Sequence, residues 1–477
     1  MTRTSPRAPA RLAEDGGRAA LICRRLTEKF RTSLFGVPVL WLIGAIIGSQ
    51  LVTQLDRRLS EDDLPAFLDT TVASARAILG AVSSGTIAAA SVVFSLTLVA
   101  IQMSSSVYSS RVLRNFLRDR FQQHMIGSVT ATFLYSLLVL REVRGPLEED
   151  AVSYIPRISV FLAVIFAVGA VLALLASISH TAQKLRVSTV TRDLYEEVAD
   201  LIATRFAERD SDEDSAARVA VGDAATHDEP RTRSPDGEET TTVTAARPGW
   251  VQQISIEALT AELPPRTSIS IDAPVGSFIM EGAPLARVWL EPGAGSTSED
   301  TPEALTHDDL SNGIRSAFEV GDERTMHQDV AFGLLMLEDV AVKALSPGVN
   351  DPNTARAVIH RLGAAILTIL ERDLPPGRFA TDDYEIWAPA EPGYRDYVEL
   401  AFDQIRLYSI DQGPVQLALV TTLVAVRREL HRRGAATEEA VAAIDASIDA
   451  VIEDMAGADG HNGSYHERAT TLAAKST

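Results

Sequence analysis

Four long apolar runs without a charged residue lie in the N-terminal third of this 477-residue chain. A helix that rises 1.5 Å per residue needs about 20 apolar residues to cross a hydrocarbon core of roughly 30 Å. The third run is short and is expected to borrow the preceding residues Phe121–His124. We therefore predict a four-helix transmembrane domain over residues 34–180, with spans at Leu34–Leu55, Ala77–Met103, Met125–Leu140 and Ile158–Ser179.

Basic residues orient the predicted spans. The segment before the first span is rich in arginine, and the loop between the second and third spans holds Arg111, Arg114, Arg118 and Arg120. The other two loops hold three arginines each and carry acidic clusters at Glu61–Asp63 and Glu148–Asp150. The positive-inside rule therefore predicts that both termini lie in the cytoplasm.

Composition narrows the classes of function. The formal net charge of −20 argues against a nucleic-acid partner, because phosphate binding requires basic patches. The single cysteine, Cys23, excludes an intramolecular disulfide framework and a multi-cysteine zinc site. The spans as delimited also lack the acids, bases and arginines that ion-coupled transporters place near the membrane midplane. We expect no cofactor, no metal site and no catalytic residues.

The spans do contain hydroxyl and amide side chains that recur at helical spacing. They form a predicted polar seam on the second and third spans, made of Ser84, Ser91, Ser95, Gln102, Ser128, Thr132 and Tyr135. Such a seam can line a water-filled path in an oligomer. It can equally mark close helix packing through small residues and weak interhelical hydrogen bonds. The sequence leaves both interpretations open.

The rest of the chain is predicted to be cytosolic. A basic N-terminus covers residues 1–33, a helix followed by a disordered acidic linker covers 181–246, and a disordered tail covers 457–477. Between them we predict a small β domain at 247–291 and an α-helical domain at 312–456. The β domain is similar to a lipoyl- or biotinyl-type barrel, but no lysine lies between Lys184 and Lys343, so a carrier role is rejected. The predicted fold is an α-helical membrane protein with a cytosolic small β-barrel-like domain and an α-helical C-terminal domain.

The helical domain contains the most distinctive polar segment. A nearly apolar helix over Gln328–Leu345 is followed by a turn in which Asp351 can cap the next helix and Pro352 suits its first position. One interpretation is a helical hairpin with a capped turn. The other is a polar pocket that holds a small anion or a nucleotide, formed by Arg324, His327, Asp329, Lys343, Asn350, Asn353 and Thr354.

Several of these segments are similar to those of one family. They are Phe94–Gln102, Tyr108–Arg120, Thr132–Tyr135, Gln328–Gly333 and Ala344–Pro352. Together they resemble the bacterial predicted-membrane-protein family catalogued as domain of unknown function 2254, over about Leu34–Leu430. The resemblance implies an inner-membrane location and a shared architecture, and it implies no activity.

Three functions from different classes fit this pattern. The first is an oligomeric, channel-like membrane protein that conducts a solute and whose cytosolic body gates or senses. The second is a membrane-anchored sensor or scaffold without conduction. The third is a membrane-bound enzyme that uses the polar residues near His327 and Asn350. The expected partners are the lipid bilayer, further copies of the chain and a small anionic ligand.

Overall fold

The computed structural model describes residues 36–59, 65, 69–107, 120–144, 154–184, 186–208, 239–261, 267–290, 307–375, 377–380, 384–389, 391–457 and 463–474. The chain forms two compact units, Met1–Arg186 and Val187–Thr477. The predicted basic N-terminus with Cys23, the loop arginines Arg111, Arg114 and Arg118, and residues 209–238 of the predicted linker lie outside the described residues.

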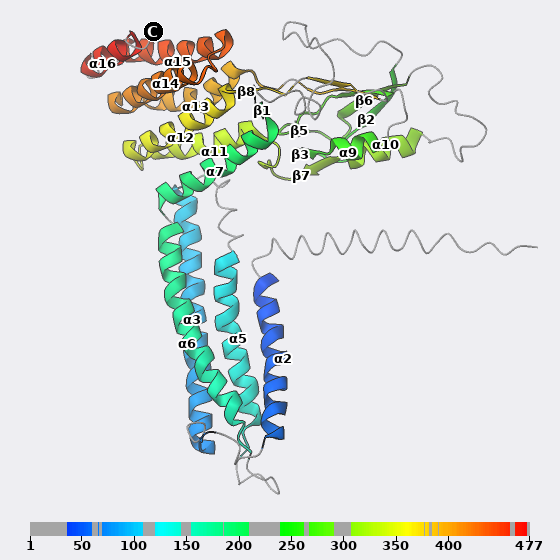
Figure 1. Cartoon of the computed structure of the whole chain (residues 1–477), viewed down its shortest axis with the longest axis vertical. Helices are drawn as coiled ribbons and strands as arrows, with labels where there is room; N and C mark the ends of the chain where they lie inside the picture. The colour runs from blue at the N-terminus through cyan, green and yellow to red at the C-terminus, as the bar shows by residue number, and fades with distance from the viewer. Residues whose placement is uncertain are drawn as a thin grey trace, which may run out of the picture. The chain divides into compact units, whose positions relative to one another are not determined.

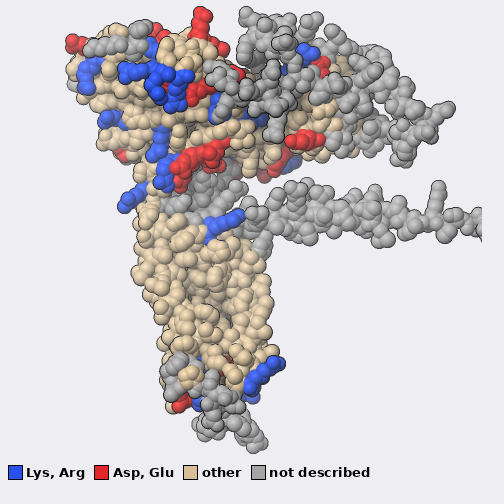
Figure 2. Space-filling view, viewed as in Figure 1, with Lys and Arg blue, Asp and Glu red and all other residues tan. Residues whose placement is uncertain are grey.

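The first unit contains four helices that are long and apolar enough to cross a membrane, which confirms the predicted spans. They are α2 (Gly36–Arg58), α3 (Val72–Val107), α5 (Arg120–Glu142) and α6 (Arg157–Lys184), shown in Figure 1. Because α5 begins at Arg120, it includes the residues that the short third run was expected to borrow. On the face seen in Figure 2, the middle of this bundle carries no charged side chain.

Helix α5 is the interior helix of the membrane unit. It packs against α2, α3 and α6, and 44% of its span is buried, against 22% for each of the other three. Near its start the Gln122 amide donates to the Thr97 hydroxyl of α3 at 2.7 Å and accepts from the Ser177 hydroxyl of α6 at 3.1 Å. A helix that faces protein rather than lipid can carry such polar side chains, because its neighbours satisfy them.

One acidic side chain lies inside the same unit. Asp56, which the sequence placed in a loop, belongs to the last turn of α2 and is only 8% exposed. Its carboxylate faces the start of α6, and the neighbouring Arg57 pairs with Glu142 of α5 at 2.6 Å. The span was therefore predicted one turn too short, since an apolar run ends before the helix does.

The second unit contains the helices predicted for the helical domain. The helix predicted at the start of residues 181–246 is confirmed as α7 (Val187–Arg205), and Gln328–Leu345 is confirmed as α11 (Val330–Leu345). The remaining helices are α12 (Pro352–Leu370), α13 (Tyr394–Tyr408), α14 (Gly413–Arg433), α15 (Glu438–Gly457) and α16 (Gly463–Ala474). Helix α14 is capped by Gly434, whose φ of 73° is the left-handed conformation that terminates helices at low cost.

Two sheets and two short helices form the β part of this unit. The five-stranded sheet has the order β2-β6-β4-β10-β9 and the three-stranded sheet the order β5-β3-β7. All the strand pairs are antiparallel except β4 with β10, and a two-stranded pair joins β1 (Ala207–Glu208) to β8 (Arg372–Asp373). The other elements are β2 (Glu239–Thr244), β3 (Gly249–Ile254), α9 (Ile256–Ala261), β4 (Thr267–Ile271), β5 (Phe278–Ile279), β6 (Pro284–Leu290), α10 (His307–Ser316), β7 (Phe318–Gly321), β9 (Arg378–Ala380) and β10 (Tyr384–Trp387).

This part corrects several predictions. The sheets do not close into a barrel among the described residues, so the barrel-like domain is not confirmed. The β part also extends past 247–291 on both sides, because β2, β7, β9 and β10 complete its sheets and α10 packs on its core. Residues 239–244 form a strand rather than a linker. The predicted disordered tail contains α16, where Ala469 is fully buried and the Ala473 carbonyl accepts from Arg427 at 2.8 Å.

Candidate functional site

The predicted anion pocket of the soluble unit divides into two groups. At the start of α11, the Arg324 guanidinium donates two hydrogen bonds to the Asp329 carboxylate, at 2.6 and 3.1 Å. Asp329 is 6% exposed and also accepts from the backbone N–H of Phe332 at 2.8 Å, which caps the helix. This pair is satisfied by the protein itself and stabilises a helix start. His327, between the two, is exposed.

The second group lies at the other end of α11. Asp351 caps α12 by accepting from the backbone N–H groups of Asn353 and Thr354 and from the Thr354 hydroxyl at 2.6 Å. These hydrogen bonds, the hydroxyl foremost, lower the pKa of Asp351. Pro352 occupies the first turn, so the predicted cap and helix start are confirmed. Lys343, Asn350 and Asn353 are exposed.

The length of α11 keeps the two groups apart. The helix has 16 residues, and at 1.5 Å per residue this separates its ends by roughly 24 Å. The structure therefore does not bring Arg324, His327 and Asp329 together with Lys343 and Asn350. Sequence proximity across a helix was mistaken for proximity in space. The capped turn accounts for Asp351, Asn353 and Thr354.

The predicted polar seam also divides. On α3, the four seam residues share one face as expected, but that face lies on the outside of the unit: Ser84, Ser91, Ser95 and Gln102 are all exposed. The inner face of α3 uses Ser83, Thr86 and Thr97 instead. The α5 members point inward, and Thr132 and Tyr135 are buried. The two halves of the seam therefore do not line one path within the chain.

The inward hydroxyls of α5 bond to backbone carbonyls. Ser128 donates to the Met125 carbonyl at 3.0 Å and Thr132 to the Ser128 carbonyl at 2.9 Å, each within α5. Tyr135 donates to the Ser159 carbonyl of α6 at 3.2 Å. Each of these hydroxyls has therefore used its one donor within the protein.

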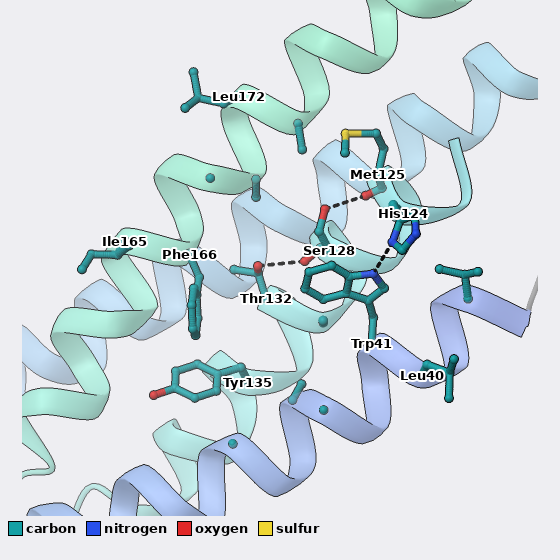
Figure 3. A pocket seen from close by; sticks show the side chains of 18 of the residues that line it. Leu40, Trp41, His124, Met125, Ser128, Thr132, Tyr135, Ile165, Phe166 and Leu172 are labelled. Carbon is teal, nitrogen blue, oxygen red and sulfur yellow. Dashed lines mark hydrogen bonds between the residues drawn. The ribbon is translucent and has the colours of Figure 1, made fainter. Parts of the chain in front are cut away.

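These three residues line a large cavity between α2, α5 and α6. Its volume is about 1010 Å³. Helix α5 forms the back of the cavity, with α2 and α6 on either side (Figure 3). The lining is almost entirely apolar, and its members are Val37, Leu40, Trp41, Gly44, Ala45, Gly48, Val52, Phe121, His124, Met125, Ser128, Ala131, Thr132, Tyr135, Ile165, Phe166, Gly169, Ala170, Leu172, Ala173 and Ala176.

Small residues keep this cavity open. Gly44 and Gly48 of α2 and Gly169 of α6 all face empty space, since a Cβ atom added at each would meet no heavy atom within 4 Å. Gly44 and Gly48 form a GxxxG pattern, which in membrane helices marks a surface that another chain or molecule approaches closely. This signal was present in the sequence and was overlooked.

A polar contact lies at one end of the cavity. The indole N–H of Trp41 donates to Nδ1 of His124 at 3.0 Å, and Figure 3 shows the two side chains together, with Tyr135 toward the other end. His124 is one of the residues that the third span was expected to borrow, but it was not among the predicted site residues. The cavity thus has an apolar body and one end that offers an imidazole.

This arrangement suits the binding of an apolar molecule. Ligand sites are concave and mostly apolar, with a few placed polar groups, and this cavity has that composition. Among the described residues, no three or more histidine, cysteine, aspartate or glutamate side chains gather closely enough to hold a metal ion.

Comparisons with known proteins agree with a membrane location. A family model described as a predicted membrane protein matches residues 31–425. Uncharacterized proteins of Mycobacterium bovis and Mycobacterium tuberculosis are 29% identical over 362 residues, which is 75% of this chain. The chain spans 64% of the length of these curated relatives. No solved structure matches it.

Proposed function

This chain belongs to the family of predicted membrane proteins catalogued as domain of unknown function 2254, and we propose that its membrane domain binds an apolar, lipid-like molecule within the bilayer. The observation that carries this proposal is the cavity between α2, α5 and α6. Its volume of about 1010 Å³ lies at the upper end of the roughly 300–1,000 Å³ typical of ligand sites. The bilayer itself is the nearest source of a molecule that fits such a lining.

The polar groups of the cavity favour a ligand over a conducted ion. Ser128, Thr132 and Tyr135 already donate to backbone carbonyls. They are the few hydroxyls of an otherwise apolar lining, whereas an ion path needs enough polar groups to replace the hydration shell of the ion. An acyl chain needs only apolar contact, which within a bilayer acts through van der Waals packing.

The family and the arginine pattern support a location and an orientation. We propose that the protein lies in the cell inner membrane, as the family resemblance implies, with both termini in the cytoplasm, because arginines concentrate before the first span and between the second and third. The cytosolic body would then report on, or respond to, the occupant of the membrane cavity.

Filling the cavity tests the proposal. Gly44→Leu and Gly169→Leu each place a side chain into open space, so both variants should fold and lose co-purifying lipid. Lipid retained by the purified full-length chain is measured by native mass spectrometry after delipidation in mild detergent. Gly85→Leu on α3 is the matched control, because its Cβ also meets open space but lies away from the cavity. Equal lipid retention by wild type and both filled variants would overturn the proposal.

A second function is favoured by the outer face of α3. Ser84, Ser91, Ser95 and Gln102 are exposed on the surface of a single chain, where polar side chains facing hydrocarbon are disfavoured. Several copies that brought these faces together would enclose a polar path, so a homo-oligomeric, channel-like protein is the alternative. Liposome flux measures it. Ser91→Leu with Ser95→Leu should abolish flux, whereas Ala88→Leu, which adds bulk to the same face, should preserve it. A membrane anchor without conduction would show no flux in any variant.

A further inference from the structure

The hydrogen bond between Trp41 and His124 fixes the protonation of the imidazole. An indole N–H can only donate, so Nδ1 of His124 must accept and cannot carry a proton. The neutral ring then carries its proton on Nε2. The ring is exposed, and Nε2 has no hydrogen-bond partner among the residues that the structure describes. The cavity therefore presents one oriented N–H donor at its end.

Arg120 carries a permanent positive charge and lies one turn before His124, at the start of α5. Arg120, His124 and Ser128 are spaced four residues apart, so they follow one another along one face of the helix. His124 and Ser128 line the cavity, which places Arg120 just beyond its end. Arg120 is exposed, and a guanidinium is always charged and matches the geometry of a phosphate. A donor and a cation thus stand together where the apolar lining stops.

The cavity is long enough to hold an acyl chain. Along α5 its lining runs from Phe121 to Tyr135, which at 1.5 Å per residue is roughly 21 Å. A hydrocarbon core is roughly 30 Å thick, so the cavity covers about two thirds of it. A molecule with acyl chains in this cavity would have its headgroup at the level of His124 and Arg120.

We propose that the ligand is an anionic phospholipid, with its acyl chain in the cavity and its phosphate bound by Nε2–H of His124 and the guanidinium of Arg120. This inference rests on the proposed lipid-binding function and adds the headgroup. A zwitterionic choline headgroup brings its own cation beside Arg120, so it binds less well. A charge-assisted hydrogen bond of this kind gives a preference of about tenfold or more.

Quenching of Trp41 by brominated lipids tests the headgroup. Of the four tryptophans in the chain, only Trp41 lies in a membrane helix, and Trp41→Phe supplies the fluorescence background. The full-length protein is reconstituted with dioleoyl phosphatidylcholine, and brominated phosphatidylglycerol or brominated phosphatidylcholine with the same chains is titrated in. The Trp41 fluorescence of wild type should be quenched at a mole fraction of brominated phosphatidylglycerol about tenfold lower than the mole fraction of brominated phosphatidylcholine that gives the same quenching.

Variants separate the headgroup from the chain site. Arg120→Gln and His124→Ala should each reduce the preference to about twofold or less, while Arg120→Lys should keep part of it because the charge remains. Arg141→Gln, at the exposed opposite end of α5, should leave it unchanged.

The outcomes distinguish the two proposals. Strong quenching by both headgroups without preference would overturn the anionic headgroup and leave the lipid-binding function standing. No quenching above the Trp41→Phe background would overturn both. Stronger binding of brominated stearate than of brominated phosphatidylglycerol would assign the site to a free carboxylate and overturn the phospholipid.

Discussion

The carboxylate of Asp56, in the last turn of α2, accepts hydrogen bonds from the backbone N–H and the hydroxyl of Ser159 in the first turn of α6, at 3.0 and 2.6 Å. It also accepts from the N–H of Ile158 at 2.9 Å. The first N–H groups of a helix have no partner within the helix, and a carboxylate from another helix satisfies them here. Asp56 therefore ties two membrane helices together at one end of the bundle.

Replacing Asp56 with alanine should lower the stability of the membrane unit by about 2–3 kcal/mol, because buried N–H groups lose a charged acceptor. Asp56→Asn should fall between wild type and alanine, since the amide keeps one acceptor oxygen. The midpoint of unfolding in detergent measures both. Asp69→Ala is the control: Asp69 pairs with Arg157 at 3.3 Å but its side chain is 70% exposed, so its loss should cost less than about 0.5 kcal/mol. Equal losses at both positions would contradict this role.

The contact between α2 and α5 depends on a glycine. A Cβ atom added at Gly127 would lie 2.6 Å from Cδ1 of Trp41 and 3.2 Å from the Pro38 Cα. Gly127→Ala should displace the Trp41 ring, break its hydrogen bond to His124 and cost about 1–3 kcal/mol. The emission maximum of Trp41 and the unfolding midpoint report these changes. Gly85→Ala, which meets open space, should be neutral or slightly stabilising, and a neutral Gly127→Ala would show that the two helices do not pack this closely.

Removing Asp329 tests whether this residue stabilises the fold or binds a ligand. Asp329→Ala removes the carboxylate that pairs with the Arg324 guanidinium and the side chain that caps α11, so the soluble unit should lose about 2–4 kcal/mol of stability. Chemical denaturation followed by far-ultraviolet circular dichroism measures the loss. Asp322→Ala is the matched control, because the Asp322 side chain is 95% exposed. An unchanged stability in Asp329→Ala would return this residue to the list of ligand candidates.

The sequence predicted local structure well and spatial proximity poorly. Asp351 and Pro352 were identified as the cap and first turn of α12 because capping is decided by residues within one turn of each other. Asp56 was placed in a loop because it lies just outside an apolar run, where hydropathy ends but the helix continues. His124 was assigned to its helix, but nothing near it in the sequence showed that it meets Trp41. The cavity itself depends on how α2, α5 and α6 pack, and no short segment encodes that arrangement. Only the GxxxG pattern at Gly44 and Gly48 pointed to it.

Glu338 is a buried titratable group of the soluble unit. It lies in the middle of α11 and is only 1% exposed. Burial, and after it the charge of the adjacent Asp339, raises the pKa of Glu338 from its ordinary 4.5 to about 7. The folded protein therefore holds a proton between about pH 4.5 and 7 that the unfolded chain has released. Stability from this group is complete below that window and is lost as the pH rises through it.

Glu338→Gln should remove this loss, because glutamine fills the same space without a titratable proton. Relative to wild type, the variant should be more stable at pH 8 by on the order of 3 kcal/mol and nearly unchanged at pH 4, since one pKa unit corresponds to about 1.36 kcal/mol. Denaturation midpoints at both pH values measure the difference. Glu453→Gln, on the exposed face of α15, should show no such pH dependence. If the Glu338→Gln variant instead lost stability at pH 8, the ionised carboxylate would be stabilising, and burial would not be the dominant effect on this group.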